Sequence, residues 1–140
     1  MEFRTFLFSW AATLAVTIAF SVLWHVVLFE EVWLALGVYN RMDDPIYGFG
    51  IAAWVLESGA FVALYRSSKW ARKSFGHALI FSVLVGAVVS ASTLFGTAAK
   101  VEISNLSIWF SLQGAFVLSH FLLLGFIAWF VSIMEMNDRD

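Results

Sequence analysis

The chain contains no cysteine among its 140 residues, so disulfide bonds, thiolate metal sites and cysteine nucleophiles are excluded. Histidine, another common metal ligand, occurs only at His25, His77 and His120. These residues fall near the outer end, the inner end and the middle of long apolar segments, so no two of them reach one metal ion. We therefore expect no metal site, no haem and no other cofactor.

Charged residues are also scarce, at 13% of the chain, and the formal net charge is −2. Without a basic patch interleaved with aromatic residues, the sequence gives no sign of a nucleic-acid partner. It also lacks a nucleophile–base set, a glycine-rich phosphate loop and paired carboxylates at catalytic spacing. We therefore expect no catalytic residues, and an enzyme is the least supported class of function.

Hydrophobic residues make up 61% of the chain and gather in four apolar runs of 20 or more residues. A helix of 20 residues spans about 30 Å, the thickness of the hydrocarbon core of a bilayer. Water is absent there, so each run must be helical. The first run is too long for a signal peptide and no A-x-A-like cleavage site follows it. The sequence predicts one all-α integral membrane domain over residues 1–140, with spans at Thr5–Phe29, Ile46–Tyr65, His77–Ala99 and Leu106–Ile133.

Basic residues divide unequally between the two sides of this predicted domain. Six of the eight Lys and Arg residues lie in the termini and in loop 66–76, whereas two lie in loops 30–45 and 100–105. Cytoplasmic loops of membrane proteins carry the excess of Lys and Arg. We therefore expect both termini to be cytoplasmic, in a multi-pass protein of the cytoplasmic (inner) membrane.

Small and hydroxyl-bearing residues recur along every predicted span. Lipid tails give helices no hydrophobic drive to associate, so such residues mark close contacts between helices. In the first span a polar residue occupies every fourth position from Thr5 to His25, along one ridge. We interpret this ridge as a packing surface; a hydrated path is the alternative. Small faces on all four spans predict an antiparallel four-helix bundle. Besides that ridge, they comprise Gly48, Ala52, Ala53, Gly59 and Ala63; Ala78, Ser82, Gly86 and Ser90; and Ser111, Ala115, Ser119, Gly125 and Ala128.

Two ionisable residues fall at the middle of predicted spans. Glu57 lies near the centre of the second span, and His120 lies near the centre of the fourth. Such residues face the bundle interior and pair or stay protonated, because a lone charge in lipid is costly. We expect Glu57 to bond His120, with Ser90 and Thr93 completing a polar cluster. The cluster is either a structural link between helices or a site for a proton or ligand.

A second polar group is expected at the outer end of the bundle. It comprises His25 at the end of the first span, Glu30 and Glu31 just beyond it, and Lys100 at the end of the third. One interpretation is interfacial solvation with partial charge pairing, which needs no function. The alternative is an outward-facing site for a cation or a polar headgroup.

The segment between the first two spans, residues 30–45, has an apolar and aromatic middle at Val32–Tyr39. It either extends the first span, lies in the outer interface as a short helix or covers the outer mouth of the bundle. Asp43, Asp44 and Pro45 form a suitable start for the second span.

The end of the first span carries a local pattern made of Trp24, His25, Leu28-Phe29 and Trp33, followed by Gly37. This pattern resembles small uncharacterised four-span membrane proteins of bacteria, whose first helix ends in a similar run of aromatic residues before a glycine. The resemblance implies the four-span architecture and a bacterial source. It implies no activity.

Two classes of function fit these observations. The first is a non-catalytic small subunit or accessory protein, embedded in the lipid bilayer and associated with other membrane subunits or with itself. It accords with the short loops and with the number of small-residue faces. The alternative is a small transporter, or a protein that binds a ligand or proton through Glu57 and His120.

Overall fold

The computed structural model describes residues 3–38 and 47–137, with side chains up to Met134. Over these residues the chain is helical and contains no strand. Four helices are long and three elements are short. They are α1 (Phe3–Val22), the π-helical turn η1 (Leu23–Leu28), α2 (Glu30–Ala35), α3 (Tyr47–Ser67), the 3₁₀ turn η2 (Ala71–Lys73), α4 (Phe75–Lys100) and α5 (Leu106–Asn137).

Four of the helical segments are long and apolar enough to cross a membrane. They cover Phe3–Leu28, Tyr47–Ser67, Phe75–Lys100 and Leu106–Met134, and each boundary lies within two residues of the boundary expected from the sequence. The prediction of an all-α, multi-pass membrane protein is therefore confirmed.

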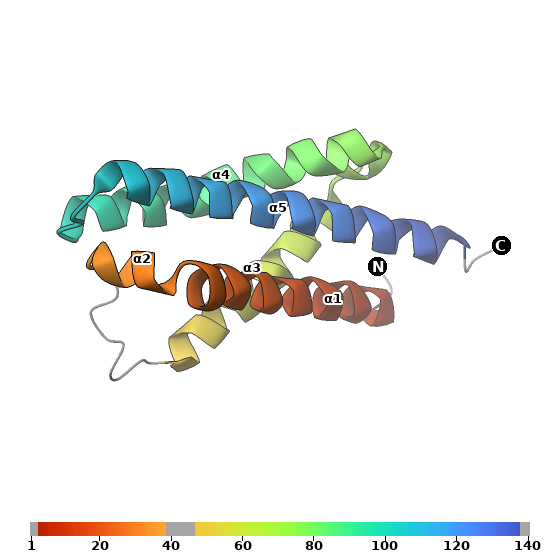
Figure 1. Cartoon of the computed structure of the whole chain (residues 1–140). Coiled ribbons are helices and arrows are strands. Elements are labelled where there is room, and N and C mark those ends of the chain that lie inside the picture. Colours follow the sequence, from red (N-terminus) through yellow and green to blue (C-terminus); the bar gives the residue numbers. More distant parts are fainter. Residues whose placement is uncertain (1–2, 39–46, 138–140) are drawn as a thin grey trace.

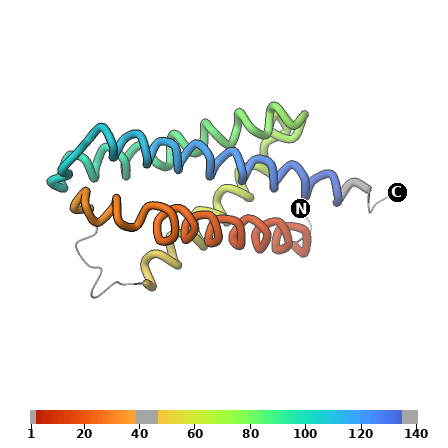
Figure 2. The backbone as a smooth tube through the Cα atoms, in the orientation of Figure 1, coloured from red at the N-terminus to blue at the C-terminus, as the bar shows by residue number. Residues whose placement is uncertain are grey.

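The long helices are arranged around α5. Helix α5 packs along both α4 and α1, whereas α3 packs chiefly on α1. Figure 1 shows α3 crossing behind α1 at a steep angle, so that its first turns diverge from the other helices. Every residue from Tyr47 to Ala53 is exposed. Helix α1 begins and helix α5 ends at the same end of the bundle (Figure 2), which we call the inner end.

Helices α4 and α5 approach each other closely because two glycines lie at their contact. A Cβ atom at Gly86 would lie 2.5 Å from the ring of Phe121, and one at Gly125 would lie 2.5 Å from Ser82 Oγ. Ala78, Ser82 and Gly86 are the buried residues of α4, which confirms three members of its predicted small face. Lipid offers no hydrophobic drive, so dense packing of this kind holds the pair together.

The polar ridge of α1 faces the bundle interior. The buried residues of α1 are Ser9, Thr13, Thr17 and Ser21, and each carries a hydroxyl group. Two of these hydroxyls donate to the carbonyl one turn earlier: Ser9 Oγ to Thr5 O at 2.9 Å, and Thr13 Oγ1 to Ser9 O at 2.8 Å. These two hydroxyls therefore enter the interior with their hydrogen bonds already made, which is consistent with the packing surface expected from the sequence.

The small faces predicted on two other helices are partly wrong. On α3, the small residues Gly48, Ala52, Ala53 and Ala63 are exposed, and on α5 so are Ser111, Ala115 and Ser119. Large side chains, among them Phe61 and Tyr65 of α3 and Phe121 of α5, fill the inner core instead. Aromatic rings fill the wider gap that the steep crossing of α3 creates, whereas the small residues lie on surfaces that would contact lipid.

Helix α2 covers the outer end of the bundle. Trp33 is completely buried and its ring meets Trp109 of α5 edge-on, with centroids 5.5 Å apart. Ser104, in the α4–α5 turn, donates from Oγ to Ala35 O at 3.0 Å. Gly37 ends the helix with a φ of 75°, a conformation that favours glycine. A short helix over the mouth, Glu30–Ala35, followed by a turn that ends at Val38, is thus the arrangement found for the described part of this segment. Tyr39, Asp43, Asp44 and Pro45 lie outside the described residues.

The α4–α5 contact makes a testable prediction about stability. Gly125→Ala should lower the free energy of unfolding by about 1–3 kcal/mol, because the new methyl group would also lie 3.1 Å from the backbone oxygen of Ala78. Gly114→Ala is the matched control on the same helix, since a Cβ atom there meets nothing within 4 Å. Unfolding in mixed micelles by titration with SDS measures both. Equal stability of the two variants would contradict the packing described.

Candidate functional site

Glu57 and His120 meet at the middle of the bundle, as the sequence predicts. Glu57 is the eleventh of the 21 residues of its span, and His120 is the fifteenth of the 29 residues of its span. Glu57 Oε1 lies 3.8 Å from His120 Nδ1. The His120 side chain is 2% exposed and that of Glu57 is 25% exposed. The imidazole is thus enclosed, while the carboxyl group keeps an accessible face.

A third helix contributes Thr17 to this site. His120 Nε2 lies 3.2 Å from Thr17 Oγ1, and Thr17 is fully buried on α1. The carboxyl, the imidazole and the hydroxyl therefore form a row across α3, α5 and α1, with the imidazole in the centre. The four-residue spacing placed Thr17 on the packing ridge and gave no sign of this contact. Its depth was the available signal, because Thr17 is the fifteenth of the 26 residues of its span.

Aromatic rings surround the imidazole. The His120 ring stacks with Phe116 at a centroid distance of 5.3 Å and with Phe20 at 5.9 Å. Phe121 meets it edge-on at 5.2 Å. These rings hold the orientation of His120 and keep water from its faces. Polar interactions are stronger in such apolar surroundings than in water.

The row can hold one proton in two arrangements. With the proton on Glu57, the carboxyl group is neutral, His120 Nδ1 faces it without a proton, and Nε2–H donates to Thr17 Oγ1. With the proton on His120 Nδ1, an imidazolium faces a carboxylate, and Nε2–H still donates to Thr17 Oγ1. The Thr17 hydroxyl accepts in both arrangements. In both arrangements the carboxyl and imidazole together carry no net charge.

Ser90 and Thr93 do not complete this cluster. Ser90 lines an apolar groove of about 290 Å³ between α4 and α5, and Thr93 is exposed. Within the described part of the chain, neither residue has a hydrogen bond to Glu57 or His120. Helix α4 meets α3 through Phe81, which lies further toward the inner end than Glu57. The outer part of α4, which carries both hydroxyls, does not reach the pair.

The outer polar group is also arranged differently from the expectation. The described residues contain no ion pair among His25, Glu30, Glu31 and Lys100. His25 turns inward, and its Nδ1 lies 3.1 Å from Ser21 O. Because a carbonyl oxygen only accepts, Nδ1 is the protonated nitrogen. The carboxyl and ammonium groups stay at the exposed ends of their helices, where water solvates them. Their role as a binding site stays a prediction.

The inward turn of His25 brings its ring close to the side chain of Gln113 of α5. Its ring stacks on Trp33 at 5.4 Å and meets Phe116 edge-on at 4.4 Å. His25 belongs to the π-helical turn η1, and π turns are frequent at functional sites. The sequence placed His25 at the outer end of the bundle but gave no sign of its approach to Gln113. The π turn itself has no sequence signal.

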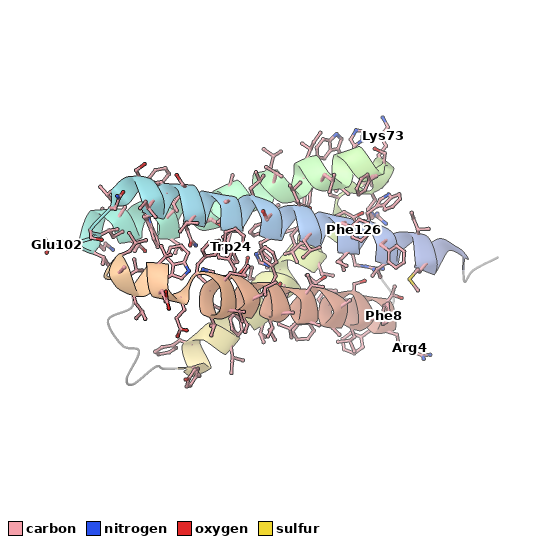
Figure 3. The ribbon with its side chains drawn as sticks, in the orientation of Figure 1. Arg4, Phe8, Trp24, Lys73, Glu102 and Phe126 are labelled. Carbon is pink, nitrogen blue, oxygen red and sulfur yellow. The ribbon has the colours of Figure 1, made fainter. Side chains whose placement is uncertain are left out.

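Polar contacts continue toward the inner end along α1. Arg66 Nη1 of α3 donates to Ser9 Oγ at 2.9 Å, and Trp10 Nε1 donates to Ser58 Oγ at 3.0 Å. Together with the Thr17 and His25 contacts, these bonds form a polar row along the interior side of α1. Figure 3 shows side chains between α1 and α5, with Trp24 labelled toward the outer end.

No other protein supplies a function for this site. No family model, curated protein or solved structure matches the chain. Among the described side chains, no three His, Asp or Glu residues lie close enough together to hold a metal ion. The resemblance of Trp24–Gly37 to bacterial four-span proteins stays a prediction. The geometry of Glu57, His120 and Thr17 is therefore the basis for a function.

The contact between His120 and Thr17 makes a second prediction. Thr17→Val keeps the shape of the side chain but leaves the buried His120 Nε2 without a partner. We expect the free energy of unfolding to fall by about 1–3 kcal/mol. Thr93→Val, on the exposed face of α4, is the matched control and should leave the stability unchanged. If both valine variants have the same free energy of unfolding, the hydrogen bond between His120 and Thr17 does not contribute to stability.

Proposed function

We propose that this chain is a membrane-embedded proton-binding protein, with Glu57 and His120 as its site. The observation that carries the proposal is the 3.8 Å approach of Glu57 Oε1 to His120 Nδ1 at mid-depth. A carboxylate at the centre of a transmembrane helix costs about 3 kcal/mol or more, and such residues mark ion and proton pathways. A proton shared with the imidazole removes the net charge.

The difference in exposure assigns different roles to the two residues. Glu57 keeps a quarter of its side chain accessible, whereas His120 is enclosed by three phenylalanine rings. Glu57 is therefore the accessible member of the pair, and His120 holds the proton in the interior. Thr17 positions the imidazole and gives Nε2 a hydrogen-bond partner in both protonation states.

The polar row along α1 supports a small transporter as the fuller form of this proposal. From Ser9 to His25 the helix rises about 24 Å, close to the 30 Å of the hydrocarbon core. Hydroxyls four residues apart are about 6 Å apart along the axis. Proton transfer along the row therefore requires a water molecule between successive hydroxyls. The Glu57–His120 pair is then the proton-binding site halfway along this path.

A titration of the His120 ring tests proton sharing. Two strongly interacting groups titrate in two macroscopic steps that belong to the pair. In the unmodified chain, ¹⁵N NMR of His120 should therefore show two steps with pH, and Glu57→Gln should leave one. Glu102→Gln, which removes an exposed carboxyl group, is the matched control and should keep both. A single step that is identical in all three proteins contradicts the proposal.

A second candidate function is a small accessory subunit or a self-associating protein. It is favoured by the divergent outer half of α3, where residues 47–53 are all exposed next to the accessible face of Glu57. A neighbouring chain seated there would shield the carboxyl group from lipid. Small residues on that face, such as Ala52 and Ala53, permit close approach of another helix.

The mass of the native complex in mild detergent tests this candidate. A partner or a second copy should be retained, and Ala52→Leu should release it by filling the space on the exposed face. Ala99→Leu, an exposed alanine at the outer end of α4, is the matched control and should leave the assembly intact. A lone chain of 15.7 kDa under all conditions removes the candidate.

A further inference from the structure

A cluster of cations lies at the end of α3 and in the connection to α4, and three of its four members take no part in the polar row along α1. Arg66, Lys69, Arg72 and Lys73 lie within eight residues, and no Asp or Glu occurs between Glu57 and Glu102. Lys69, Arg72 and Lys73 are exposed, and none has an ion pair among the described residues. The described carboxylates, those of Glu30, Glu31, Glu57 and Glu102, lie in other parts of the molecule.

The backbone of this connection is held in one conformation. Ala71 is completely buried in the inner core, and its amide donates to Ser68 Oγ at 3.1 Å. Lys73 N donates to Trp70 O at 3.2 Å, which closes the 3₁₀ turn. Because Ala71 points inward, the residues on either side of it point outward. Three cationic side chains are thus displayed from a fixed turn instead of a loose loop.

Apolar and aromatic surface lies next to the cations. Trp70 is 46% exposed, and its ring meets His77 edge-on at 5.0 Å. Phe75, at the start of α4, is also exposed. Tryptophan at the end of a span lies at the level of lipid headgroups. A ligand on this surface therefore meets positive charge on one side and apolar rings on the other.

We propose that the α3–α4 connection binds the headgroup of an anionic phospholipid. Lys69, Arg72 and Lys73 would contact its phosphate, and Trp70 and Phe75 would pack on its glycerol and acyl region. Basic clusters at the ends of membrane spans recognise anionic headgroups in this way, and each Lys or Arg contributes appreciably to the attraction. The apolar surface of Trp70 and Phe75 favours a lipid over free phosphate, because free phosphate has no apolar part to contact it. Figure 3 places Lys73 at the same end as Arg4 and opposite Glu102, so one leaflet supplies the lipid.

Purified protein in detergent, titrated with short-chain phosphatidylglycerol or phosphatidylcholine, tests the proposal by native mass spectrometry. Phosphatidylglycerol should bind at least about tenfold more tightly than phosphatidylcholine. The triple variant Lys69→Gln, Arg72→Gln, Lys73→Gln should lose that preference. Lys100→Gln, at the opposite end, should keep it.

Three results would overturn the proposal: equal binding of the two lipids, an unchanged preference in the triple variant, or competition by millimolar inorganic phosphate as effective as the lipid. If the triple variant does not fold, Arg72→Gln alone and a salt titration of the unmodified protein replace it. Loss of the preference at high salt is then the expected result, and a preference that salt does not change opposes the proposal.

Discussion

Lipid gives apolar helices no reason to associate, and this constraint shapes the whole molecule. The bundle is held by close packing and by polar groups that lack water as an alternative partner. Both kinds of contact are present: Gly86 and Gly125 let α4 meet α5, and the hydroxyls of Ser9, Thr13, Thr17 and Ser21 line the interior face of α1. The mid-depth site depends on the polar contacts, because Thr17 belongs to the row of hydroxyls on α1 and also bonds His120.

The same constraint explains why the interior is polar at the centre and aromatic around it. His120 has Glu57 on one nitrogen and Thr17 on the other, and phenylalanine rings cover its faces. The rings exclude water, and the two polar neighbours replace it. Toward the inner end, the polar residues of the interior are Arg66 and Ser9. Toward the outer end, they are His25 and Gln113.

The sequence predicted the features that depend on length and depth. The span boundaries agree to within two residues, and the proximity of Glu57 and His120 followed from their equal depth. Features that depend on how helices rotate and cross were missed or wrong. The steep crossing of α3 exposes Ala52 and Ala53, and the π turn directs His25 to Gln113. No single-sequence pattern encodes a crossing angle, and a small residue faces lipid as readily as it faces a neighbour.

The row on α1 has a consequence for the register between helices. Its hydroxyls repeat every four residues, so a slide of α1 past α5 by about one turn, close to 5.4 Å, would offer His120 the hydroxyl of Thr13 or Ser21 in place of Thr17. Adjacent positions are chemically alike, and one-turn ratchets of this kind occur in switching proteins. The bond of Trp10 Nε1 to Ser58 Oγ has no equivalent one turn away, because Phe6 and Leu14 carry no side-chain donor. This contact, more than the central one, therefore fixes the axial position of the first helix.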